Sequence, residues 1–128
     1  LPESDLIIAL QVFRQAGHAE TVEALEQKVL HSVESLSAEA IAHLLYQHGK
    51  ERVGSRTLIS ALLLRANAFL EEVPEFRKST FMQFALGLDL CGAHEHELFK
   101  GLQVFVSDKR HKFGAQDRVL LAQTGLQL

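Results

Sequence analysis

Apolar residues recur at intervals of three and four along the chain, and this period constrains the fold more than any other feature. In one typical stretch, residues 22, 25, 29, 33 and 36 are all Val or Leu and would lie on one face of a helix. No segment alternates apolar and polar residues over four or more positions, so no strand is predicted. Seven segments are predicted to be α-helices: 3–16, 19–34, 38–48, 55–72, 76–91, 94–107 and 115–125.

Residues that favour helix ends lie where these apolar stripes stop. Ser37 precedes an Ala-Glu-Ala run and is predicted to be an N-cap. Pro2 suits the first turn of the first helix, and Pro74 is predicted to end the fourth, because the residue before a proline avoids the α conformation. Four glycines each follow an apolar stripe and are predicted to end a helix in the left-handed conformation: Gly17, Gly49, Gly92 and Gly125.

These four glycines are separated by 32, 43 and 33 residues, which indicates a repeated unit of two helices. A period of this length is typical of α-solenoids, in which stacked hairpins bury a continuous core. The predicted fold is therefore all-α, with about seven helices in stacked antiparallel hairpins that form one helical-repeat domain over residues 1–128. An irregular helical bundle is the alternative, because glycine ends helices in every helical architecture. Because the chain starts with Leu1, we expect it to be a fragment or a processed part of a longer chain.

Composition excludes several classes of protein. Hydrophobic residues make up 47% of the 128 residues, which is ordinary for a globular domain and excludes general disorder. The single cysteine, Cys91, excludes an intramolecular disulfide framework and is compatible with an intracellular location. No apolar run approaches the length of a membrane span, so no membrane insertion is expected. The net charge of −3 excludes a strongly basic nucleic-acid-binding arm.

Catalytic and cofactor motifs are missing from the sequence. It contains no Gly-x-Ser-x-Gly elbow and no glycine-rich phosphate loop, so we expect neither enzyme activity nor a cofactor. Cys91, His94 and His96 are the residue types that zinc prefers, but side chains two positions apart on a helix point about 200° from each other. We therefore expect no metal site, and interpret these residues as a buried thiol and two solvated histidines.

Basic residues gather in the second part of the chain. Residues 1–50 carry three Lys or Arg against seven Asp or Glu, whereas residues 51–128 carry ten against nine. The cations lie at predicted turns and helix starts, where a stack of hairpins would align them along an edge able to contact phosphates. Solvated turns and contact with an acidic protein remain two other interpretations. Seven residues are candidates for RNA contact: Lys109, Arg110, Lys112, Arg77, Lys78, Arg52 and Arg56.

Two aromatic residues lie near these cations. Phe76 precedes Arg77, and Phe113 follows Lys112. Exposed rings at such positions could stack on bases, although packing in the core is the simpler interpretation.

Two segments of the chain resemble the octotricopeptide and heptatricopeptide repeats of organellar proteins, which are also found with RAP domains. Residues 92–102 contain a glycine, a polar gap and Leu98-Phe99, and residues 112–126 contain Phe113, Gln116-Asp117 and a Leu/Ala-rich stretch before Gly125. Residues 36–45 match the second half of the pattern. The resemblance implies a non-catalytic subunit of a mitochondrial or plastid ribonucleoprotein, such as the mitoribosome or the RNA-processing machinery. Such a subunit would contact RNA through basic turns and other protein subunits through helix faces. A protein–protein scaffold of another mitochondrial complex, without RNA contact, is the alternative.

Overall fold

The computed structural model describes residues 2–72 and 76–128, and all regular structure in these ranges is helical. The prediction of an all-α fold with seven helices is confirmed, and the predicted bounds agree with the observed ones to within three residues. The predicted helix end at Pro74 lies outside the described residues. In chain order the α-helices are α1 (Glu3–Gln15), α2 (Ala19–Ser32), α3 (Ala38–Glu51), α4 (Arg56–Glu72), α5 (Lys78–Leu90), α6 (Glu97–Lys109) and α7 (Ala115–Gln123). Two short 3-10 helices are η1 (Val33–Ser35) and η2 (Arg110–Lys112).

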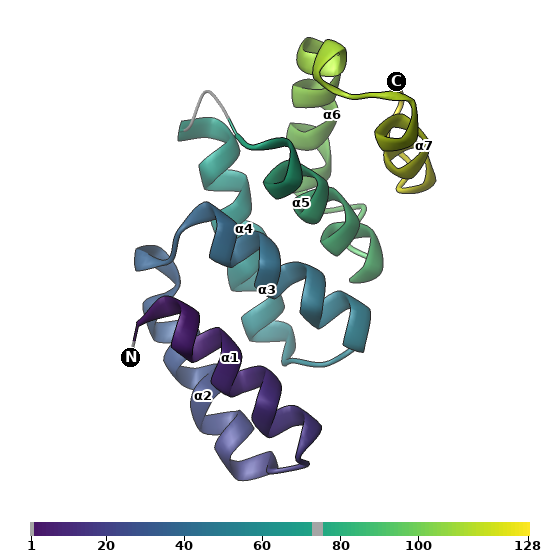
Figure 1. Ribbon diagram of the computed structural model, residues 1–128. Helices are drawn as coiled ribbons and strands as arrows, with labels where there is room; N and C mark the ends of the chain where they lie inside the picture. The colour runs from purple at the N-terminus through teal and green to yellow at the C-terminus, as the bar shows by residue number, and fades with distance from the viewer. Residues whose placement is uncertain (1, 73–75) are drawn as a thin grey trace.

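Consecutive helices pair antiparallel along the chain, as α1 with α2, α3 with α4 and α5 with α6, and α7 follows (Figure 1). Helix α3 contacts both α1 and α5, while α4 contacts both α2 and α6. The most extensive helix–helix contact is the one between α3 and α5. The helices thus lie in an order that follows the sequence, while the regular superhelix of a solenoid stays a prediction.

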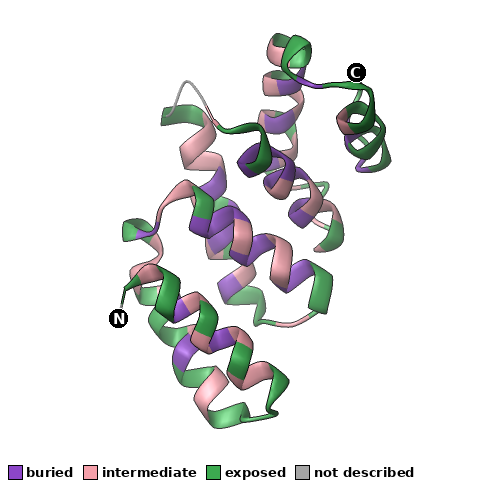
Figure 2. Ribbon diagram, in the orientation of Figure 1, coloured by how far each residue is buried: buried purple, intermediate pink, exposed green. Residues whose placement is uncertain are grey.

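The core is built from the predicted apolar stripes of α1 to α6. In α7 the predicted stripe is wrong, because Val119 and Ala122 are exposed and Leu121 is buried instead. Buried residues line the sides on which neighbouring helices meet, and exposed residues gather on the outer sides and in the turns (Figure 2). Leu44 and Leu62, each at the centre of a predicted stripe, are both buried. The ring of Phe113 is buried 5.3 Å from that of Phe81, and the ring of Phe76 lies 5.8 Å from that of Phe84. Phe113 is therefore part of the core, and the half-buried Phe76 packs against it through Phe84 and Phe105, which favours packing over base stacking for both rings.

Ser37 is the N-cap of α3, as predicted. Its Oγ accepts a hydrogen bond from the Ala40 N–H at 3.1 Å, which satisfies one of the free donors of the first turn. The same hydroxyl donates to Glu3 at 2.8 Å, and the Ser37 N–H donates to the other carboxylate oxygen of Glu3 at 2.7 Å. Ser37 therefore connects the start of α3 to the start of α1, where Pro2 is the N-cap residue.

We expect Ser37→Ala to lower the free energy of unfolding by about 1–2 kcal/mol, because it removes the cap and the hydroxyl contact with Glu3. Urea denaturation followed by circular dichroism measures the loss. Ser35→Ala is the matched control, since the Ser35 hydroxyl is exposed and bonds only to the carbonyl of Ser32. It should change stability by less than about 0.5 kcal/mol. Equal losses for the two variants would contradict the proposed connection between α1 and α3.

The prediction for Gly49 is wrong. Gly49 lies inside α3 and is buried, and the helix continues to Glu51 before Arg52 adopts the left-handed conformation with φ 55°. A Cβ at Gly49 would lie 2.7 Å from the Cβ of Leu90, so the glycine permits close packing of α3 against the end of α5. When Arg52 is counted instead of Gly49 as the residue that ends α3, the four helix-ending residues are separated by 35, 40 and 33 residues, which is a more even spacing. The other three glycines have positive φ as predicted: Gly17, Gly92 and Gly125.

Candidate nucleic-acid interface

The structure brings five of the seven candidate cations to one end of the molecule, where α5 begins and α6 ends (Figure 1). The Lys78 Nζ lies 3.0 Å from the Asp117 Oδ2, which ties the start of α5 to the start of α7. A guanidinium nitrogen of Arg118 donates to the backbone carbonyl of Arg110 at 3.0 Å and ties α7 to η2. We call the resulting surface the basic end, and its residues are Arg77, Lys78, Lys109, Arg110, Lys112 and Arg118.

The local sequence explains why these cations face solvent. Helix α6 tightens into the 3-10 turn η2, and the Phe113 N–H donates to the carbonyl of Arg110 at 3.1 Å. Phe113 then anchors the linker in the core, so the polar residues before it are left outside. Arg110 and Lys112 are exposed, and Lys109 is half-buried. An apolar anchor beside a run of cations therefore produces a positive surface at a fixed place.

The basic end is positive although the chain as a whole is negative. It carries six cations, and the neighbouring acids within it are Asp108 and Asp117. The hydrogen bond from Lys78 holds the pKa of Asp117 below its usual range, so that this carboxylate neutralises one cation. Arg77 and Lys112 are exposed and form no salt bridge with any residue that the structure describes. Positive charge therefore remains available to an anionic partner.

Arg118 is a member of the basic end that sequence reasoning missed. Its Nε donates to the carbonyl of Phe113 at 3.0 Å, in addition to the contact with Arg110. The sequence feature that could have indicated Arg118 is the short interval between the basic run at 109–112 and the first turn of the helix that starts at Ala115. A residue in that first turn lies beside the linker whatever the remainder of the fold.

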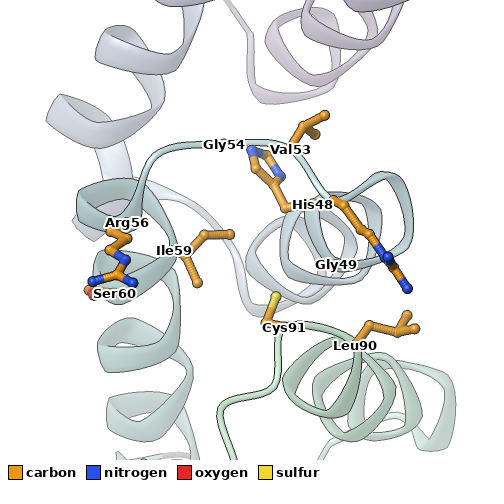
Figure 3. A pocket seen from close by; sticks show the side chains of 10 residues that line it. His48, Gly49, Val53, Gly54, Arg56, Ile59, Ser60, Leu90 and Cys91 are labelled. Carbon is orange, nitrogen blue, oxygen red and sulfur yellow. The ribbon is translucent and has the colours of Figure 1, made fainter.

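Arg52 and Arg56 lie elsewhere, in the connection between α3 and α4. They line a pocket of about 480 Å³ that also contains Cys91, which points into it beside the end of α5 (Figure 3). Lys78 begins α5, so the length of that helix, about 20 Å, separates this pocket from the basic end. The predicted cations thus do not form one continuous stripe, because the helices hold the two groups at opposite ends.

A buried polar cluster borders this pocket through His48 (Figure 3). His48 is 1% exposed, its Nδ1–H donates to the carbonyl of Leu44 at 2.7 Å, and its Nε2 accepts from Arg14 at 2.7 Å. Arg14 also donates to Glu26 at 2.6 Å. Burial, with a smaller contribution from the Arg14 charge, lowers the pKa of His48 to about 4, so the ring is neutral at pH 7. His48 follows Ile41, Leu44 and Leu45 at helical spacing in the sequence, but no local pattern indicated its partner Arg14.

The Cys91, His94 and His96 side chains have separate surroundings. The His94 Nε2 lies 2.7 Å from the Asp89 Oδ1, and the His96 Nδ1 accepts from the Leu98 N–H at 3.0 Å. His96 is therefore a half-buried N-cap of α6 and not the solvated residue that we expected, because the helix starts one residue after it. Cys91 is half-buried and not fully buried as expected, and its partial burial raises the pKa of the thiol. Within residues 2–72 and 76–128, no three His, Cys, Asp or Glu side chains are grouped so that they could hold a metal ion.

Comparison with known proteins yields no relative. No family model, no curated protein and no solved structure matches the chain. None of the helices in the described part of the chain combines the length and the apolar character that a membrane crossing requires. The binding properties of the basic end are therefore argued from its charge alone, which attracts anions.

Proposed function

We propose that this protein is a non-catalytic helical subunit of a mitochondrial ribonucleoprotein, such as the mitoribosome or the RNA-processing machinery, and that its basic end contacts RNA. The observation that supports this proposal is the convergence of cations from three separate segments in a chain of net charge −3. The mitochondrial location and the ribonucleoprotein rest on the resemblance to octotricopeptide and heptatricopeptide repeats. The location of the native protein in fractionated cells, detected with an antibody, tests the mitochondrial location.

The chemistry of the basic end favours contact with phosphates over the reading of bases. Lys and Arg side chains that neutralise phosphates release counterions, and this release makes binding depend on salt. Phe113 is buried in the core and the half-buried Phe76 packs against the rings of Phe84 and Phe105, so both rings are engaged within the protein. Phosphate contacts position an RNA without selecting its sequence. We therefore expect this surface to bind single-stranded RNAs of different sequence with similar affinity.

The test replaces three cations of the basic end, Lys109, Arg110 and Lys112, by alanine. Loss of three phosphate contacts should reduce the slope of log affinity against log salt by up to about two, at ~0.7 per contact for a single strand. Titration of a fluorescent RNA at several salt concentrations measures this slope. The matched control is the triple alanine variant of Lys50, Arg52 and Arg56, which removes the same charge at the opposite end of α5 and should keep the slope of the unmodified protein.

Two outcomes would contradict the proposal. Equal reductions of the slope in both triple variants would mean that RNA responds only to the net charge. An unchanged slope in the first variant would mean that the basic end does not contact phosphate. Thermal melts should show both variants within about 0.5 kcal/mol of the unmodified protein, as for ordinary surface changes.

A scaffold of a mitochondrial complex without RNA contact is the second candidate function. It is supported by large apolar side chains that the fold leaves more than half exposed on four helices: Ile8, Val12, Leu64, Val104 and Val119. Exposed apolar groups of this size are typical of surfaces that other proteins cover. Purification of the native protein with protein partners but without RNA would favour this function.

A further inference from the structure

A groove of about 800 Å³ runs between α4 and α6, away from most of the basic end. Its floor is apolar and includes Leu70, Val104 and Phe105, and the Val104 side chain is 62% exposed. At Gly101 the two helices come close, since a Cβ there would lie 3.2 Å from a methyl carbon of Leu70. A hollow with an apolar floor and close, rigid walls is the shape that receives an apolar side chain of a partner.

The walls of this groove carry mostly negative charge. Four carboxylates line it, from Glu71, Glu72, Glu97 and Asp108, against the two ammonium groups of Lys100 and Lys109. Among the residues that the structure describes, none of the four carboxylates forms a salt bridge. The groove therefore has the opposite sign to the basic end, although Asp108 and Lys109 belong to both surfaces.

We propose that this acidic groove binds a basic amphipathic α-helix of a protein partner. In a helix-in-groove complex, apolar side chains at positions i, i+3 or i+4, and i+7 enter the groove. Those of the partner would contact Leu70 and Val104, while its Lys or Arg residues on both flanks would face the carboxylates. This inference does not rest on RNA contact at the basic end.

The dimensions of α6 give the length of the bound helix. Glu97, Gly101, Val104 and Asp108 follow one another at helical spacing on the face that lines the groove. At 1.5 Å per residue they cover about 16 Å, which corresponds to three turns of a partner helix. An extended peptide is less suitable, because both walls are helices whose backbone groups are already paired and offer no sheet edge.

Other occupants fit the groove less well. The phosphates of RNA would meet four carboxylates, and like charges at short distance repel. A second copy of this chain offers no suitable helix, since none of its seven described helices contains more than two Lys or Arg residues. A protein partner whose helix combines an apolar stripe with several cations matches both the floor and the walls.

The test uses a fluorescein-labelled amphipathic peptide of leucine and lysine, about 12 residues or three turns long, and its leucine–glutamate counterpart. We expect the lysine peptide to bind and the glutamate peptide not to bind. Amide shifts in the NMR spectrum of the protein should change within residues 67–72 and 97–109 when the lysine peptide is added. The change in anisotropy of the label gives the affinity.

Val104→Arg should weaken binding of the lysine peptide at least about tenfold, because it places a cation in the middle of the apolar floor. The matched control is Val119→Arg, which makes the same substitution at a side chain that is 58% exposed on α7. It should change the affinity less than about twofold, as an energetically neutral surface position does. The double variant Glu97→Gln and Asp108→Asn should weaken binding roughly threefold and reduce its salt dependence.

Several results would overturn the proposal. If the two arginine variants weakened peptide binding equally, or if amide shifts changed outside the groove, peptide binding would depend only on the net charge of the protein. Amide shift changes within residues 67–72 and 97–109 on addition of an RNA oligonucleotide alone would assign the groove to RNA. Self-association of the unmodified protein that Val104→Arg abolishes would assign it to a second copy. A variant with Arg110→Ala and Lys112→Ala leaves the groove residue Lys109 in place and should weaken RNA binding without changing peptide binding, so failures of the two proposals are distinguishable.

Discussion

Replacing Gly87 by alanine is expected to lower the free energy of unfolding by about 2–3 kcal/mol, although alanine is the better helix former by about 1 kcal/mol. Gly87 lies in α5, where a Cβ would come within 2.9 Å of the Tyr46 N and 3.0 Å of the Leu45 carbonyl carbon. These are backbone atoms of α3, a helix with several fully buried side chains, so they have no room to withdraw. The two helices with the most extensive contact would therefore have to separate.

The matched control is Gly101→Ala in α6. Its Cβ would meet only the ends of two side chains, a methyl carbon of Leu70 at 3.2 Å and the amide oxygen of Asn67 at 3.3 Å. These groups can rotate away, and the gain in helix propensity offsets the adjustment, so the stability should stay within about 1 kcal/mol. Urea denaturation followed by circular dichroism measures both variants. If Gly101→Ala costs as much as Gly87→Ala, contact with the α3 backbone is not the cause.

The second large effect concerns pH. When the pH falls from 7 to 4.5, the free energy of unfolding should decrease by roughly 2–3 kcal/mol, because His48 is buried in its neutral form. The pKa of His48 is lowered from 6.5 to about 4 in the folded protein. Below pH 6.5 the unfolded chain therefore binds a proton that the folded protein does not bind. The stabilisation is complete above pH 6.5 and is lost as the pH falls toward 4.

The variant His48→Gln isolates this contribution. Glutamine does not titrate, so the difference in stability between the two proteins should change with pH while contributions from carboxylates cancel. Urea denaturation at pH 7 and pH 4.5 measures this difference, and an NMR titration of the His48 ring measures its pKa directly. A ring that titrates near 6.5, or a difference that is constant with pH, would contradict the buried contact with Arg14 and Leu44.

Much of the fold could be predicted because its signals are local. An apolar residue every three or four positions is sufficient to define the buried face of a helix, and the burial of Leu44 and Leu62 follows from it. Ser37 caps α3 by accepting a hydrogen bond from the N–H of Ala40, three residues later, so this contact is also short-range. The positive surface was visible in the run at 109–112, since charge at a turn remains in solvent in most folds.

Apart from His96, whose error is a local one in the start of α6, the positions that failed have surroundings that come from distant parts of the chain. Gly49 was predicted to end a helix, because no local signal shows that Leu90, 41 residues later, packs against it. The two groups of candidate cations were predicted to share one edge, but α5 holds them at its opposite ends. The groove between α4 and α6 likewise exists only because those helices lie side by side.

The sequence by itself therefore determined the all-helical class, the seven helices and the buried side of α1 to α6, but not that of α7, where the predicted Val119 and Ala122 are exposed and Leu121 is buried. These properties depend on interactions among residues at most four positions apart, which form in a helix regardless of what surrounds it. Only the tertiary structure decided that His48 meets Arg14, 34 residues away, and that Lys78 meets Asp117 at the basic end. Such contacts depend on how the helices pack, and packing is set by the shapes of many side chains together and not by any single pattern in the chain.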